Sequence, residues 1–227
     1  MAGLALGLVV ACGTERTPKM VVAETTKPAV PMAAPTATRE RPMALRREGQ
    51  DLLDSARMAL IGGDAALAAT LLRKGALFLV RQAHSPPNRG TNDLLAAARG
   101  LDSLAADVRQ HRLVDSLRLD RLSAHANLAE AERHVALASV AWSTWSKESV
   151  SDELTMAADH IQRAGRDGGI TLSPAMRSVV ANLHAIVRDL STKPGPDLRA
   201  LDDPLASLHI EIQAMHRRLE RTPNGAP

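Results

Sequence analysis

The sequence predicts an all-α protein, an antiparallel bundle of about seven helices. Apolar residues recur at spacings of three and four almost without a break after Met43, as in amphipathic helices. Aromatic residues supply only 1% of the chain, so Leu, Ala, Val and Ile must fill the core, and these residues pack closely between facing helices. Clusters of Gly and Pro separate the periodic stretches, as loops between helices do.

The first three helices follow from these breaks. The first is expected over residues 45–61 and ends at Gly62-Gly63. Asp64 then caps a second helix over 65–84, which closes a helical hairpin. The segment 85–90, with its two prolines, breaks the chain, and a third helix follows over 92–109.

Four more helices are expected in the second half. The longest covers 113–146, and Ser149 or Ser151 caps a fifth over 152–165, which stops at the glycine-rich segment 165–169. Pro174 opens a sixth helix, which ends near Leu190, because a proline at the first helical position loses no hydrogen bond. The last covers 198–221, or restarts at Asp203-Pro204, and a disordered tail follows over 223–227.

An internal similarity suggests how these helices are grouped. An offset of 82 residues superposes Asp107 on Asp189 and His134 on His216, together with several Leu and Ala positions. Two similar helical units that share the long central helix would produce this match. The alternative is coincidence, because any two amphipathic helices share Leu and Ala through their common period.

Charge argues against one class of partner. The 28 Lys and Arg residues and the 25 Asp and Glu residues are interspersed along the chain, as on solvated helix faces. A nucleic-acid interface would need a basic face with stacking aromatic residues. We therefore expect no nucleic-acid partner.

The N-terminus carries a processing signal. An apolar run from Leu4 to Val10, too short to span a bilayer, precedes Ala11 and Cys12. The stretch Val9-Val10-Ala11-Cys12 resembles the lipobox of bacterial lipoproteins, with an aliphatic residue three positions before the cysteine and a small residue just before it. The missing Lys or Arg before Leu4 departs from that pattern, and an earlier start codon would explain it.

The resemblance implies a location. Residues 1–11 would be a signal peptide, and Cys12 would carry a diacylglycerol that anchors the protein to the cell envelope. Because Gly13 follows Cys12 where an Asp would retain a lipoprotein at the inner membrane, the implied site in a Gram-negative host is the outer membrane, facing the periplasm. Cys12 is also the only cysteine, so it has no internal disulfide partner.

A tether is expected between the anchor and the helices. Residues 12–43 are rich in Pro, Thr and Ala, which indicates a disordered spacer. At about 3.1 Å per residue when extended, such a spacer lifts a domain well clear of the membrane. The expected organisation is thus a lipid anchor and tether over 12–43 followed by a helical domain over 44–222.

The sequence shows no motif for catalysis. No nucleophile motif of the form Gly-x-Ser-x-Gly occurs, and Gly62-Gly63 and the glycines of 165–169 are interpreted as helix stops. The paired acids Asp152-Glu153 and Asp202-Asp203 are expected at helix starts, where carboxylates complement the helix dipole. We therefore expect no enzyme activity and no cofactor.

Histidines and tryptophans are the remaining candidates for a ligand site or an interface. His209 and His216 are seven residues apart, roughly 10 Å along a helix, which is too far for one ion. A site between helices, such as His134 with His216, is the alternative to histidines that merely flank the core. Trp142 and Trp145 are either an aromatic lip for a ligand or, as we favour, plugs at the end of the core.

These observations predict a lipid-anchored envelope scaffold that binds an unidentified protein or cell-wall partner through a helical face. A periplasmic carrier of a small ligand or metal is the alternative, and an enzyme of unknown class is a second alternative. No metal ligand set is assigned from the sequence.

Overall fold

The computed structural model describes residues 37–110, 112, 116–144, 146–192 and 201–221, with side chains from Glu48 onward. The chain separates into two units, Met1–Ala37 and Thr38–Pro227, and the helices belong to the second apart from the first residue of α1. In the described residues there are seven helices and no strand: α1 (Ala37–Ile61), α2 (Ala65–Ala83), α3 (Thr91–Arg109), α4 (Ser116–Ser143), α5 (Lys147–Asp167), α6 (Pro174–Thr192) and α7 (Asp202–Arg221). The all-α fold class is therefore confirmed.

Several helix ends lie where the sequence places them. The carboxylate of Asp64 accepts a hydrogen bond from the Leu67 amide at 2.9 Å and caps α2. Pro174 is the first residue of α6, and the Ser173 hydroxyl oxygen accepts from the Met176 amide at 3.0 Å. Helix α7 starts at Asp202, next to the predicted restart.

Two predicted starts were wrong. Helix α5 begins at Lys147 after Ser146, so neither Ser149 nor Ser151 is its cap. Helix α1 begins at Ala37 and includes Pro42, whereas the sequence suggested a start at 45 and a tether up to 43. Pro42 is the sixth residue of this 25-residue helix, where a proline removes one interior hydrogen bond, and the helix continues through it. The signal peptide, Cys12, the tether up to residue 36 and the tail 223–227 lie outside the described residues.

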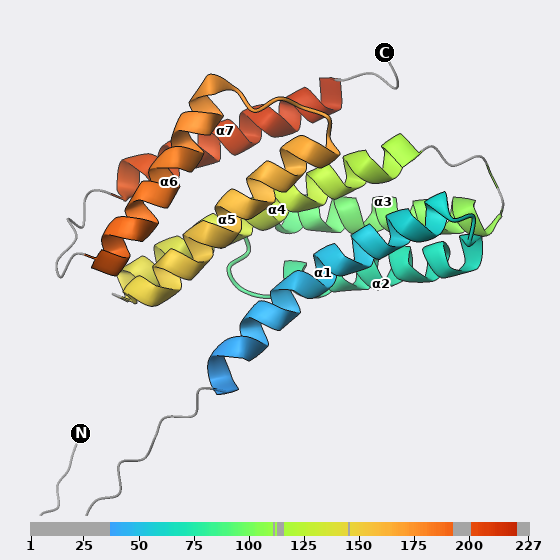
Figure 1. Cartoon of the computed structure of the whole chain (residues 1–227), viewed down its shortest axis with the longest axis horizontal. Coiled ribbons are helices and arrows are strands. Elements are labelled where there is room, and N and C mark those ends of the chain that lie inside the picture. The colour runs from blue at the N-terminus through green and yellow to red at the C-terminus, as the bar shows by residue number, and fades with distance from the viewer. Residues whose placement is uncertain (1–36, 111, 113–115, 145, 193–200, 222–227) are drawn as a thin grey trace, which may run out of the picture. The chain divides into compact units, whose positions relative to one another are not determined.

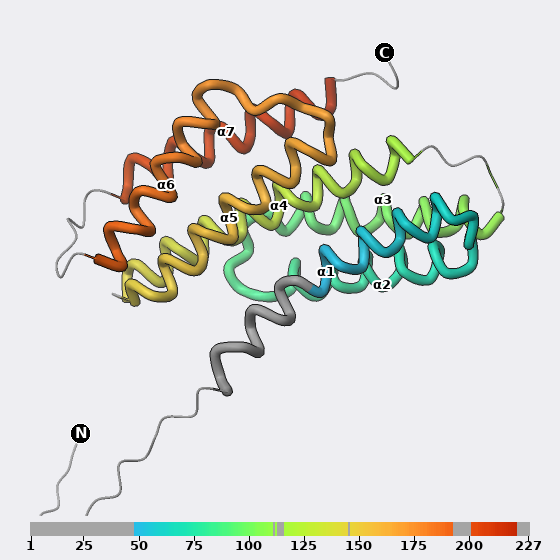
Figure 2. The backbone as a smooth tube through the Cα atoms, in the orientation of Figure 1, coloured from blue at the N-terminus to red at the C-terminus, as the bar shows by residue number. Residues whose placement is uncertain are grey.

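Helix α4 belongs to two hydrophobic cores. Its backbone runs between the group of α1, α2 and α3 and the group of α5, α6 and α7 (Figures 1 and 2). One core joins α1, α2 and α3 to a face of α4 that carries Leu119, Ala126 and Ala129. The other joins α5, α6 and α7 to a second face, with Leu128, Val135 and Ala138 among its members. The described helices thus form two groups that share the central helix, in the arrangement that the internal similarity suggested; duplication itself stays a prediction.

The shared position buries the middle of α4 on all sides. Every residue from 126 to 136 is buried, although this stretch includes Asn127, Glu130, Glu132, Arg133 and His134. A helix covered on all sides is normally apolar throughout, and buried polar groups need partners inside the protein. The polar residues of α4 are therefore the first place to look for function. No helix in the described part of the chain combines the length and apolar character needed to cross a bilayer.

Candidate metal centre

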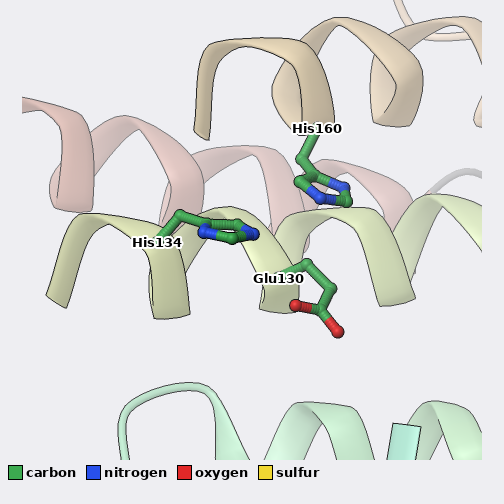
Figure 3. A group of neighbouring side chains, drawn as sticks. All are labelled: Glu130, His134 and His160. Carbon is green, nitrogen blue, oxygen red and sulfur yellow. The ribbon is translucent and has the colours of Figure 1, made fainter. Parts of the chain in front are cut away.

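The buried polar residues of α4 meet a histidine from α5. Glu130 and His134 lie one helical turn apart on α4, and His160 faces them from α5 (Figure 3). One potential ligand atom from each of the three lies within 4.8 Å of the other two, and all three side chains are buried. Among the described residues, this is the one group of three or more His, Cys, Asp or Glu side chains that meets this separation.

His134 is oriented by a carboxylate. Its Nδ1 atom lies 2.6 Å from Oε2 of Glu153 on α5, and both side chains are buried. A carboxylate accepts, so this contact favours a proton on Nδ1 and leaves the lone pair on Nε2. Metal-binding histidines commonly donate their second nitrogen to a carboxylate in this way.

His160 is oriented by an amide. Its Nδ1 atom lies 2.8 Å from Oδ1 of Asn127, while Nδ2 of the same amide donates to Oδ2 of Asp167 at 3.1 Å. The Asp167 carboxylate requires the amide nitrogen on its side, so the amide oxygen must face His160. The Nδ1 atom of His160 then donates, and its Nε2 atom also keeps the lone pair.

Burial keeps His160 neutral. The pKa of His160 lies well below its ordinary value because the buried ring is poorly solvated, and His134 and Arg163 add repulsion. The rings of His134 and His160 are stacked, with centroids 5.3 Å apart and planes 17° apart. A neutral imidazole with a free nitrogen lone pair is the form that binds metal ions.

A small cavity adjoins the group. It measures about 20 Å³, room for one water-sized occupant. Gln50, Asn127, Glu130 and His160 supply its polar wall. Apolar side chains, among them Leu53 of α1 and Phe78 of α2, line the remainder. The cavity is therefore a water-sized space beside Glu130 and His160, bounded on one side by residues of α1 and α2.

The structure separates the histidines that the sequence suggested as a pair. His134 stacks on His160, whereas His216 of α7 lies against His125, with their Nδ1 atoms 3.4 Å apart. Trp142 is half-buried and packs against the second core, as a plug would. Trp145 lies outside the described residues.

Sequence reasoning missed Glu130, Glu153, His160 and Asn127. Glu153 was expected to cap a helix start, but α5 begins at Lys147, which places Glu153 in the second turn against His134. Two signals were available. Glu130 and His134 have the spacing of four that suits one ion, and His160 lies within the apolar stripe of α5 between Ala157 and Ala164.

A second polar group joins α4 to α7. Gln213 donates a short hydrogen bond to buried Glu132, and Nδ1 of His209 lies 3.7 Å from the same carboxylate. Burial raises the pKa of Glu132 and lowers the pKa of both His125 and His216. These groups make the contact between α4 and α7 sensitive to protons.

Comparison with known proteins identifies no relative. The chain matches no protein-family model, no curated protein and no solved structure. Function is therefore inferred from the chemistry of the buried group between α4 and α5.

Proposed function

We propose that this protein binds one divalent transition-metal ion, with zinc the best fit, through Glu130, His134 and His160. The observation that carries the proposal is the orientation of the two imidazoles. Both are held through Nδ1, by Glu153 and by Asn127, which leaves the Nε2 lone pair of each ring for a metal, and both rings belong to a buried group with the Glu130 carboxylate. The function is thus metal binding by a helical domain.

The donor atoms need only a small movement to close on an ion. Ligands at 2.0 to 2.1 Å from a tetrahedral zinc are about 3.4 Å from one another. The three donors lie within 4.8 Å of one another, so each separation must shorten by at most about 1.4 Å. Because the rings of His134 and His160 are nearly parallel, one ring must also turn about χ2 to aim at a shared ion, and this turn changes the geometry of its Nδ1 hydrogen bond.

Cavity size favours zinc over iron. Two histidines and one carboxylate also bind non-haem Fe(II), which keeps open positions for oxygen and substrate. Four-coordinate zinc needs one further ligand, and a space of about 20 Å³ accommodates one water. The same size argues for holding an ion rather than transforming a substrate.

The proposed location comes from the sequence. Lipid on Cys12 would attach the protein to the envelope, with the metal-binding domain on the periplasmic side. We therefore propose an envelope lipoprotein that carries a metal ion.

Zinc titration tests the proposal. The full chain with Cys12→Ala is suitable, because this change removes both the lipid and the only thiol. We expect one zinc per chain by native mass spectrometry and more than tenfold weaker affinity after Glu130→Gln or His160→Gln. His184→Gln is the matched control, since His184 is exposed on α6.

Cobalt substitution gives an independent reading of geometry. Co²⁺ in the site should show the intense visible absorption of a four-coordinate ion, and His160→Gln should remove it. Zinc binding that is absent from the parent chain, or equal in all three variants, would contradict the proposal.

The predicted interaction module is the second candidate. It is favoured by large apolar side chains exposed in the last turn of α1, where Met58 is 67% and Ile61 is 70% exposed. Crosslinking in native membranes tests it. A partner whose capture is lost in Met58→Asp with Ile61→Asp would support this function, and unchanged capture would count against it.

A further inference from the structure

We infer that Arg57 is a positioning residue for the metal centre and that it latches helix α1 over the cavity. This inference rests on the proposed metal binding for its ligand. Its central observation is a continuous chain of polar contacts from the buried imidazole of His160 to the guanidinium of Arg57.

Helix α1 forms one wall of the cavity. Gly49, Gln50 and Leu53 line the space opposite Asn127, Glu130 and His160. The packing here is close, because a Cβ atom added to Gly49 would lie 2.3 Å from Cε1 of Phe78, another residue of the cavity wall. Movement of α1 would therefore change the shape of the cavity wall beside the proposed ligands.

Arg57 ties α1 to both helices that carry the ligands. Its Nε and Nη2 atoms donate to Oδ1 of Asp120 on α4 at 2.9 and 2.6 Å. Its Nη2 atom also lies 3.6 Å from Oδ1 of Asp167 on α5. One side chain thus holds three helices at the edge of the site.

Asp167 connects Arg57 to the proposed metal ligand His160. Its Oδ2 atom accepts the hydrogen bond from Asn127, whose amide oxygen in turn holds Nδ1 of His160. The Arg57 charge lowers the pKa of Asp167 against the larger opposing effect of burial, and thereby favours the carboxylate that orients the amide. Arg57 thus acts on His160 through two intermediate side chains.

Gln50 connects Arg57 back to the cavity through Asp54. Its amide donates to Oδ1 of Asp54 at 3.2 Å, and Asp54 lies 3.4 Å from Nη1 of Arg57. Movement of Arg57 would therefore disturb both the residue that orients His160 and a residue of the cavity wall. Metal binding and the position of α1 should be linked in both directions.

Metal release kinetics test the inference. Zinc-loaded protein, as the full chain with Cys12→Ala, is mixed with excess chelator, and release is followed by stopped flow. We expect Arg57→Leu to release zinc about tenfold faster, the lower range for residues that support metal ligands. Arg57→Lys should restore part of the effect, because it keeps the charge and loses the paired donors.

The matched control uses an ion pair away from the site. Nη1 of Arg118 on α4 lies 2.6 Å from Asp107 of α3, and neither residue lines the cavity. Arg118→Leu should leave the release rate within about twofold, the ordinary effect of an exposed ion pair. Equal release rates in Arg57→Leu and the parent would overturn the inference.

Hydrogen exchange separates the latch from the metal. In metal-free protein, Arg57→Leu should speed amide exchange in residues 48–61 of α1 and leave α6 unchanged, whereas Arg118→Leu should not affect α1. If the parent chain binds no zinc, the proposed function fails, and the exchange comparison still tests whether Arg57 holds α1 in place. Unchanged amide exchange in α1 of the Arg57→Leu variant would overturn the inference that Arg57 holds this helix.

Discussion

The Nδ1 atom of His134 lies 2.6 Å from a carboxylate oxygen of Glu153, and both side chains are buried. The contact joins the second turn of α5 to the middle of α4. It fixes the imidazole so that its other nitrogen is available beside Glu130 and His160. Four predictions follow from this contact and from other features of the chain.

Removal of the Glu153 charge should weaken metal binding. Glu153→Gln keeps the shape of the side chain but makes it a poorer acceptor for the Nδ1 proton, so His134 becomes a weaker ligand. We expect zinc affinity to fall about 10- to 100-fold in competition with a chromophoric chelator. Asp159→Asn, on the exposed side of α5, should leave affinity unchanged. Equal affinities in the two variants would show that Glu153 does not support the ligand.

Acid should destabilise the metal-free fold through its buried histidines. Burial lowers the pKa of His216, and His125 adds repulsion, against attraction from Asp93 and Glu220. The unfolded chain binds a proton at such a position below about pH 6.5, whereas the folded chain binds it only at lower pH. The free energy of unfolding should therefore fall as pH drops through about 6.5, until the folded pKa is reached.

Urea unfolding between pH 7.5 and 5.5, with chelator present, measures this dependence. His216→Gln should flatten it by up to about 1.4 kcal/mol per pH unit, the contribution of one proton. His184→Gln, at an exposed position, should leave the slope as in the parent. A parent chain with constant stability over this range would contradict the prediction.

Replacement of two glycines with similar backbone angles should lower the free energy of unfolding by different amounts. Gly90 has φ +73° and Gly63 has φ +76°, both in the left-handed region. A Cβ atom at Gly90 would lie 2.7 Å from the carbonyl oxygen of Ala129 on α4, whereas nothing lies within 4 Å at Gly63. We expect Gly63→Ala to cost about 1 to 2 kcal/mol, from backbone strain alone. Gly90→Ala should cost at least about 1 kcal/mol more, because the backbone of α4 cannot move aside without loss of packing. Denaturant unfolding of both variants checks the difference, and equal costs would show that the α3 start can move away from α4.

Loss of the lipobox cysteine should release the protein from membranes. Cys12→Ala removes the acceptor for the lipid, and each buried methylene of an acyl chain contributes about 0.8 kcal/mol to membrane binding. Palmitate labelling and membrane fractionation measure the change. A parent chain that takes up no label and fractionates like the variant would contradict the predicted anchor.

Local chemistry made most helix boundaries predictable. Asp64 caps α2 because its carboxylate reaches an amide of the same first turn, and Pro174 starts α6 because that position needs no donor. Such contacts span a few residues, so the sequence contains both partners. The start of α1 was missed because Pro42 was expected to interrupt a helix, whereas α1 continues through it.

Tertiary structure decided the site. His134 was a sequence candidate, but its neighbours Glu153 and His160 come from another helix, and the side that α5 presents depends on packing. The spacing of Glu130 and His134 was readable in the sequence, whereas their burial was not. The sequence by itself determined the helices and the resemblance to a lipobox at Cys12. Only the packing of α4 between two cores enclosed its polar residues, because burial depends on elements distant in the chain.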